Sequence, residues 1–362
     1  MTQEQRDELT RRRFVQQIAG AAGGMLLSAG VGLGQGVPPA DQIRNYVEGM
    51  EYRRLGRSGL WCSHLGLGGH HLSGDQEMRN QVVAKALELG INYFDTTGDN
   101  EAIELGLSLE ACGGRGRAYI VRDFLQARDP NLRQAPEAEY KRVVREHFQL
   151  GLEQLRTNYV DVFRMTPPEG NPPEWPMEEF HNVHWFAQVF EELKAAGQVG
   201  SMGLSTHNPE FNARAVREVP QLDLVYLPYN YVFSGAADRL YDFAVGEGTL
   251  FEFAHAQDKG IVTIKPFMKT TLFSTEAFQK RFDEQKRPAD TPTAFALRYV
   301  LANPDITVTI PGMDTPEHVA ANVAALRAGA LTAAEHQALT ASCAGIEDRL
   351  PAEYAWAHLW RA

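Results

Sequence analysis

Short hydrophobic runs alternate along the chain with longer segments whose apolar residues recur every three or four positions. The short runs are rich in β-branched and aromatic residues, which is typical of buried strands, and the longer segments are typical of amphipathic helices. Strands are therefore expected over 64–69, 91–97, 118–121, 159–165, 199–204, 222–227, 260–265 and 306–310. Helices are expected between them, over 78–89, 101–111, 137–155, 251–257 and 292–301, and in a segment that ends near Gly197.

Eight strands that alternate with helices predict an α/β fold, a parallel and closed (β/α)8 barrel of the TIM type. Two short strands around a turn at Ser58-Gly59 are expected to form an N-terminal hairpin lid. We expect the barrel domain over 51–350. A polar, Pro-containing linker precedes it over 36–50, and a C-terminal tail follows over 351–362.

The N-terminus carries consecutive arginines, Arg11, Arg12 and Arg13, ahead of an uncharged segment rich in Gly and Ala. This pattern resembles a twin-arginine export signal over 1–35, and its glycines would weaken an ordinary starting helix. We therefore expect the twin-arginine export machinery as a partner. The expected location is periplasmic or otherwise extracytoplasmic.

Composition narrows the classes of function. The formal net charge of -11 and the pI near 5.5 argue against nucleic acid or an anionic membrane as a partner. No run is long and apolar enough to predict a membrane span. The cysteines, Cys62, Cys112 and Cys343, are too widely spaced to indicate a disulfide framework or a metal site. The expected partner is a small-molecule substrate.

The chemistry of a (β/α)8 barrel lies at the C-terminal ends of its strands. Asp95 ends a buried strand, where a charge is costly unless it is paired or used in chemistry, although a helix-capping role is the alternative. Asp95 and Asp123 should lie on adjacent strands, where repulsion raises one pKa and creates an acid–base pair. Arg164 should face the same interior side and needs an anionic partner. A purely structural ion-pair cluster is the competing interpretation.

Several motifs together resemble those of the aldo-keto reductase family, over about residues 51–330. They are YRRLGRSGL at 52–60, LGLG at 65–68, GINYFDT at 90–96, NYVD at 158–161, GLS at 203–205 and IPG at 310–312, with Asn322. The resemblance implies the (β/α)8 fold. It also implies an oxidoreductase that uses NAD(P)(H) on a small carbonyl, alcohol or sugar.

The resemblance further implies a set of four catalytic residues, of which Asp95 matches the aspartate. The tyrosine, lysine and histidine positions of the family fall on Asn100, Asp123 and Thr166. The family's tyrosine is the proton donor and its lysine lowers the pKa of that tyrosine, so both functions have lost their usual residue. Arg122 would reach the lysine's position by a one-residue slip, but strand alternation points it the other way.

By the same resemblance, the cofactor is expected to contact residues along the later strands: Ser205, Thr206, Tyr226, Lys265, Gly312, Thr315 and Asn322. Ser205 matches the residue that holds the nicotinamide amide, whereas Thr206 and Tyr226 replace an asparagine and a glutamine of the family. The chain after the last strand offers no basic clamp for a 2′-phosphate, so NADH is expected to bind at least as well as NADPH. No iron–sulfur cluster is expected, because no second cysteine follows Cys343.

Two classes of function stay open on the sequence alone. The first is the oxidoreductase that the resemblance implies. The second is a repurposed barrel, which performs redox-neutral acid–base chemistry on a carbohydrate-like substrate or binds a ligand without catalysis, as a pseudoenzyme.

Overall fold

The computed structural model of the 362-residue chain describes residues 37–68, 75–167, 177–243, 246–286, 290–343 and 350–360. The predicted export signal over 1–35 lies outside the described residues. No helix within these ranges is both long enough and apolar enough to cross a membrane.

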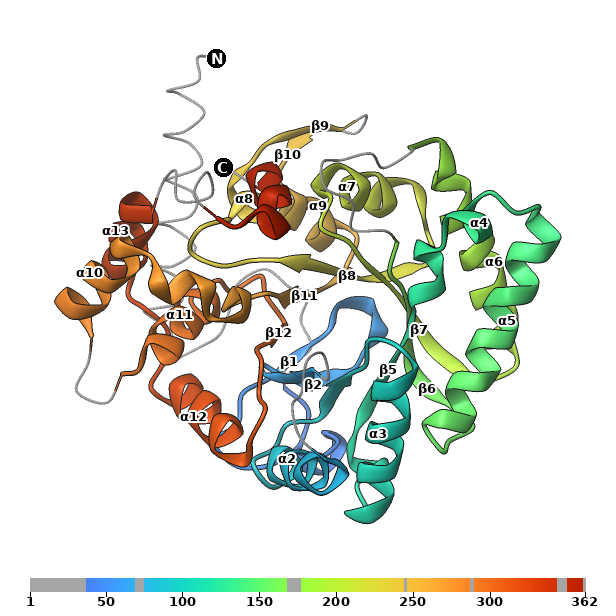
Figure 1. Ribbon diagram of the computed structural model, residues 1–362, viewed down its shortest axis with the longest axis horizontal. Helices are drawn as coiled ribbons and strands as arrows, with labels where there is room; N and C mark the ends of the chain where they lie inside the picture. Colours follow the sequence, from blue (N-terminus) through green and yellow to red (C-terminus); the bar gives the residue numbers. More distant parts are fainter. Residues whose placement is uncertain are drawn as a thin grey trace.

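Eight parallel strands form one sheet in the order β12-β11-β8-β7-β6-β5-β4-β3, and a parallel bridge between Leu65 and Thr309 joins its two edges. The strands are β3 (Gly66–Gly68), β4 (Tyr93–Asp95), β5 (Tyr119–Phe124), β6 (Val160–Met165), β7 (Val199–Ser205), β8 (Leu222–Pro228), β11 (Gly260–Ile264) and β12 (Val308–Ile310). Helices surround this sheet (Figure 1). The predicted (β/α)8 barrel is therefore confirmed.

The longer helices of the outer layer are α2 (Gln76–Glu88), α3 (Asp99–Ala111), α5 (Glu137–Gln154), α6 (His181–Ala195), α7 (Pro209–Glu218), α9 (Leu250–Ala256), α10 (Glu276–Gln285), α11 (Pro292–Leu301), α12 (Pro316–Arg327) and α13 (Ala333–Cys343). Two short α-helices, α4 (Pro130–Arg133) and α8 (Gly235–Asp238), lie in the connections. Side-chain caps explain several helix starts. Asn208, Thr291 and Thr315 each accept a backbone N–H of the helix that follows, and proline occupies its first turn.

A hairpin of β1 (Tyr52–Arg54) and β2 (Trp61–Ser63) closes the N-terminal end of the barrel, as predicted. Leu55 and Cys62 are fully buried and belong to the cluster of side chains that fills the barrel. The short turn η2 (Gly56–Ser58) lies against the start of β11, where a Cβ on Gly56 would come within 2.2 Å of the backbone of Gly260. Glycine is needed here both for this contact and for its φ of +52°.

The segment 37–50, predicted as a linker, packs against the barrel beside this hairpin. Arg44 donates hydrogen bonds to the carbonyl oxygen of Ala118 at 2.7 Å and to Asp161 at 3.1 Å. Ile43 and Met50 are buried in the main hydrophobic core. The ordered barrel unit therefore begins before residue 51.

Two further details differ from the sequence prediction. The strand expected over 118–121 continues to Phe124 as β5, because its two charged residues, Arg122 and Asp123, are both buried and paired. A second antiparallel pair, β9 (Tyr241–Phe243) with β10 (Gly246–Gly248), was not predicted. The longer β5 carries Asp123 inside the regular pairing with β6.

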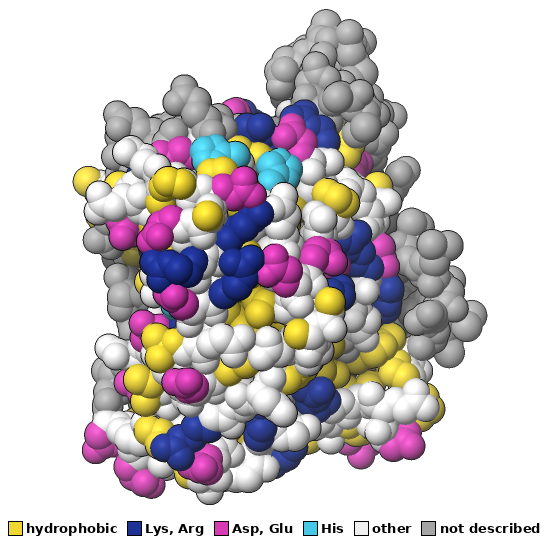
Figure 2. All heavy atoms as spheres, turned by 90° about the vertical axis from the view of Figure 1, so that its right-hand side faces the viewer, with side chains coloured by type: hydrophobic (Ala, Val, Ile, Leu, Met, Phe, Trp, Pro, Cys, Tyr) yellow, Lys and Arg dark blue, Asp and Glu magenta, His cyan; other side chains and the backbone are white. Residues whose placement is uncertain are grey.

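The side of the barrel covered by α5 and α6 has a surface of mixed charge. Figure 2 shows acidic and basic side chains interspersed over the right-hand side of Figure 1. Arg142 pairs with Glu139 and Glu146 on the same helix, and Arg145 pairs with Glu192 on the neighbouring helix. Charges on this side are therefore balanced locally.

Candidate active site at the mouth of the barrel

Asp95, Asp123 and Arg164 lie together on the interior face of three neighbouring strands, β4, β5 and β6. Asp123 and Arg164 are direct register partners. The Nη1 atom of Arg164 donates a hydrogen bond to Oδ1 of Asp95 at 2.5 Å, and its Nη2 atom lies 3.4 Å from Oδ2 of Asp123. One guanidinium therefore bridges both carboxylates.

Thr166 extends this cluster past the end of β6. Its hydroxyl donates a hydrogen bond to Oδ1 of Asp123 at 2.5 Å. Nη2 of Arg164 also donates to the carbonyl oxygen of Thr96 at 3.1 Å. We call Asp95, Asp123, Arg164 and Thr166 the inner cluster; each is at most 6% exposed.

The charges of the inner cluster do not cancel, because two carboxylates share one guanidinium. Burial raises the pKa of Asp95 to about 6 from its usual 3.8; Arg164 opposes this shift and the charge of Asp123 adds to it. A carboxyl group that titrates near neutral pH can both donate and accept a proton. The inner cluster therefore has the property that an acid–base catalyst needs.

Below the inner cluster lie two tyrosines of the barrel interior. The ring of Tyr226 on β8 faces the guanidinium of Arg164, with Cζ 4.8 Å from the ring centroid. The hydroxyl of Tyr226 is hydrogen-bonded to the hydroxyl of Tyr93 on β4. Both tyrosines are fully buried. The structure thus places Tyr226, which the sequence assigned to the cofactor, in contact with the inner cluster.

A second group of polar residues lies on the outer face of β5. Arg122 points away from the barrel axis, as strand alternation predicts, and its Nη2 atom donates to Asp99 at 2.5 Å. Nε2 of His147 on α5 lies 2.8 Å from the carbonyl oxygen of Asp123 and must donate to it. Nη2 of Arg122 lies 3.5 Å from Nδ1 of His147. We call Asp99, Arg122 and His147 the outer cluster.

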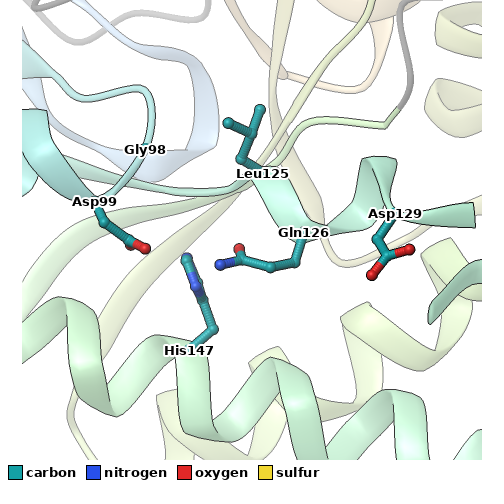
Figure 3. A pocket seen from close by; sticks show the side chains of 6 residues that line it. All are labelled: Gly98, Asp99, Leu125, Gln126, Asp129 and His147. Carbon is teal, nitrogen blue, oxygen red and sulfur yellow. The ribbon is translucent and has the colours of Figure 1, made fainter. Parts of the chain in front are cut away.

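The outer cluster was not predicted as a unit, although Arg122 was noted. Burial, and then the charge of Arg122, lower the pKa of His147 to about 4, so this ring is neutral at pH 7. A pocket of about 250 Å³ lies beside it (Figure 3), lined by Gly98, Asp99, Leu125, Gln126, Asp129 and His147. Figure 3 shows the side chains of Asp99, Gln126 and His147 turned toward one another.

Asn100, which the sequence predicted at the family's tyrosine position, lies in the first turn of α3, where it is exposed. Two residues of β7 and its loop lie on the predicted cofactor side. Ser205 is 4% exposed, and the hydroxyl of Thr206 accepts a hydrogen bond from the backbone N–H of Asn208 at 3.0 Å. Thr206 therefore helps to shape the turn that starts α7.

The remaining predicted cofactor residues follow β11 and β12. Nδ2 of Asn322 on α12 donates to the carbonyl oxygen of Gly312 at 3.4 Å, and Thr315 caps the same helix. Lys265 has a φ of +62°, a left-handed conformation that is unusual for lysine, and its carbonyl oxygen accepts from Asn230 at 2.9 Å. Strained backbone of this kind is common at functional sites.

The end of the chain, predicted as a tail, packs over the loops after β7 and β11. It forms the 3-10 segment η8 (Ala352–Trp360). Trp356 stacks on His207 with ring centroids 4.1 Å apart, and Nε1 of Trp360 donates to the carbonyl oxygen of His207 at 2.6 Å. Tyr354 donates to the carbonyl oxygen of Met268 at 3.2 Å. This segment therefore joins two loops of the predicted cofactor side.

Within the ranges that the structure describes, no group of three or more His, Cys, Asp or Glu side chains is placed to hold a metal ion.

Comparison with known proteins agrees with this architecture. The sequence model described as "Aldo/keto reductase family" matches residues 64–343. The "Uncharacterized oxidoreductase YqkF" of Bacillus subtilis (strain 168) is 25% identical over 317 residues, covering 80% of this chain and 95% of that protein. The holo form of aldo-keto reductase AKR11C1 from Bacillus halodurans superposes with a TM-score of 0.62 at 23% identity, covering 81% and 96% of the two chains. Its apo form gives a TM-score of 0.61.

The protein is therefore of the (β/α)8-barrel class, with polar side chains at the C-terminal ends of its strands. The chain belongs to the aldo/keto reductase family.

Proposed function

We propose that the protein is an oxidoreductase that uses NAD(P)(H) on a small carbonyl, alcohol or sugar, and that its inner cluster handles the proton of the reaction. One observation carries this proposal. Asp95, Asp123 and Thr166, which the resemblance assigns to three of the family's catalytic positions, form one connected network with Arg164 at the strand ends. A connected network of this kind, where the resemblance implies the catalytic residues, is better explained by retained chemistry than by unrelated losses.

The proton would pass through the carboxylates of the inner cluster. Burial raises the pKa of Asp95 to about 6, and Arg164 stabilises its charged form. Oδ1 of Asp123 accepts a hydrogen bond from the hydroxyl of Thr166. Its Oδ2 atom is buried and lies 3.4 Å from Nη2 of Arg164. Substrate oxygen bound near Asp95 and Asp123 would receive or lose its proton there.

For the cofactor, the residues after β12 fit better than those on β8. Gly312 is exposed just before α12 and its carbonyl oxygen accepts from Asn322 of that helix, and by the family resemblance Ser205 matches the residue that holds the nicotinamide amide. Tyr226 does not fit a cofactor contact, because its ring and hydroxyl are already engaged. A bound nicotinamide would supply or accept hydride. We expect NADH to bind at least as well as NADPH.

A second candidate function is the repurposed barrel that the sequence leaves open. The inner cluster contains a carboxylate pair, which is typical of redox-neutral acid–base chemistry, and its burial also suits a ligand-binding barrel without turnover. This alternative predicts that the protein binds its ligand without needing a nicotinamide.

Fluorescence titration of the purified protein with NADH and NADPH tests the proposal. We expect both to bind, with NADPH favoured by no more than about tenfold, or about 1.4 kcal/mol. In a screen of sugars and small aldehydes, Asp123→Asn should abolish turnover while Asp161→Asn, a buried ion-paired aspartate at the opposite end of the barrel, should preserve it. Failure to bind either nucleotide would contradict the oxidoreductase proposal.

We also propose that residues 1–35 direct export through the twin-arginine machinery, on the basis of Arg11, Arg12 and the uncharged segment after them. A reporter fused to this segment should leave the cytoplasm. Replacing both residues, with Arg11→Lys and Arg12→Lys, should retain the reporter inside. Export that persists after this double replacement would refute the proposal.

A further inference from the structure

The barrel interior contains a polar contact that the proposed chemistry does not use. Tyr226 on β8 and Tyr93 on β4 come from strands separated by three others in the sheet, so their hydroxyl groups meet across the interior. Burying two phenol hydroxyls is costly unless they are hydrogen-bonded, and here the two hydroxyls are hydrogen-bonded to each other. This pairing fixes the rotation of both rings.

The neighbouring strands are shaped around these two rings. A Cβ on Gly203 of β7 would lie 2.9 Å from Cε2 of Tyr226, and a Cβ on Gly66 of β3 would lie 3.2 Å from Cδ1 of Tyr93. Both contacts are closer than ordinary van der Waals distance. The absence of side chains at these two glycines therefore lets the rings occupy their positions.

The guanidinium of Arg164 lies over the ring held in this way. Its Cζ is 4.8 Å from the Tyr226 centroid, within the range of an attractive cation–π contact, which is strongest where water is excluded. The Nη atoms of the same guanidinium meet Asp95 and Asp123. Arg164 is thus held between one aromatic face and two carboxylates.

We propose that Tyr226 is a positioning residue of the inner cluster: its ring, locked by the hydroxyl of Tyr93, holds the guanidinium of Arg164 against Asp95 and Asp123. Its role in catalysis rests on the proposed function, but the positioning itself does not. The titration of Asp95 reports it directly, because a well-placed guanidinium stabilises the charged carboxylate. This measurement needs neither cofactor nor substrate.

The test compares Tyr226→Leu in two backgrounds. The midpoint of Asp95 is followed by carbon-13 NMR of labelled aspartate carboxyl groups, with Asp95→Asn identifying the signal. In the wild-type background, Tyr226→Leu should raise the midpoint by about 0.5 to 1 pH unit, because the guanidinium is no longer held. In Arg164→Met, where no guanidinium remains to be positioned, the same replacement should leave the midpoint unchanged.

Two results would overturn the proposal. Equal shifts in both backgrounds would mean that Tyr226 acts only through general solvation, and a downward or absent shift in the wild-type background would mean that it does not hold Arg164. Should Tyr226→Leu fail to fold, Tyr93→Phe removes the lock without changing volume and should raise the midpoint by a smaller amount. Its matched control is Tyr119→Phe, in the same interior cluster but beneath Arg44, which should cause no shift.

These results also separate this inference from the function. Loss of the proposed oxidoreductase activity, shown by a failure to bind nicotinamide, would leave the titration result intact. Normal nucleotide binding with no effect of Tyr226→Leu on Asp95 would refute the positioning role alone.

Discussion

Two adjacent buried residues of β5, Arg122 and Asp123, point to opposite faces and belong to clusters with different charge. The outer cluster pairs one aspartate with one arginine beside a neutral histidine. The inner cluster shares one arginine between two aspartates. The ion pair of the outer cluster is therefore neutral overall, whereas the inner cluster carries an excess negative charge.

This difference in charge determines what each cluster can do. A balanced ion pair has little reason to take up a proton, so the outer cluster is suited to holding α3, β5 and α5 together. In the inner cluster burial raises the pKa of Asp95, and the charge of Asp123 adds to that shift. Catalytic chemistry is therefore expected on the inner face and support on the outer face.

The largest effect is expected when the shared cation is removed. Arg164→Met leaves two buried carboxylates facing each other, and we expect the free energy of unfolding to fall by about 3–5 kcal/mol near neutral pH. Urea denaturation measures it. Arg145→Met is the control, because its pairing with Glu192 is exposed, and it should change stability by less than about 1 kcal/mol. Equal losses of unfolding free energy in the two variants would show that leaving the buried carboxylates of the inner cluster unpaired is not destabilising.

A smaller loss is expected from disturbing the outer cluster. A Cβ on Gly151 of α5 would lie 2.3 Å from Nε of Arg122, so Gly151→Ala must displace that buried side chain. We expect a loss of about 1–3 kcal/mol, measured in the same way. Gly116→Ala meets nothing within 4 Å and serves as the control. If nucleotide binding and Asp95 titration change as well, the two clusters are not independent.

The pH dependence of the free energy of unfolding should have opposite signs for Asp95 of the inner cluster and His147 of the outer cluster. The folded-state pKa of Asp95 is raised from 3.8 to about 6, so its contribution to stability is present below pH 3.8 and is lost as pH rises toward 6. The folded-state pKa of His147 is lowered from 6.5 to about 4, so its contribution is present above pH 6.5 and is lost as pH falls toward 4. Between about pH 4 and 6 the two slopes oppose each other.

Replacing either Asp95 or His147 leaves the pH dependence of stability that the other residue causes. In Asp95→Asn the free energy of unfolding should rise more steeply with pH than in the wild type, and in His147→Gln less steeply, by up to about 1.4 kcal/mol per pH unit in each case. Unfolding curves at half-unit steps from pH 4 to 6.5 provide the measurement. Slopes that change in the same direction in both variants would contradict the assignment.

The sequence predicts the barrel and most of the inner cluster for one physical reason. Buried strands leave a hydrophobic pattern in the chain, and strand alternation then places Asp95, Asp123 and Arg164 on one face. It cannot show the role of Tyr226, because the partner Tyr93 lies across the barrel rather than nearby in the chain. That contact exists only after the sheet closes.

The outer cluster and the C-terminal segment were missed for related reasons. His147 lies on the apolar side of α5 and looks like an ordinary core position until that helix packs on β5. Segment η8 is short and aromatic, with no strong helical pattern, and it is fixed by contacts such as Trp356 on His207. Segment 37–50 looks polar because Arg44 and Asn45 make hydrogen bonds to the barrel beside only two buried apolar residues, Ile43 and Met50.

The most direct test of the shared charge is a double-mutant cycle with Arg164→Met and Asp123→Asn, measured as free energies of unfolding. Asp123→Asn keeps the shape of the side chain and removes one of the opposed charges. We predict that it relieves part of the damage caused by Arg164→Met, so that the double variant is more stable than the sum of the single effects by well over 0.5 kcal/mol. Additive effects within about 0.5 kcal/mol would mean that the two residues do not interact, and the inner cluster would have to be abandoned.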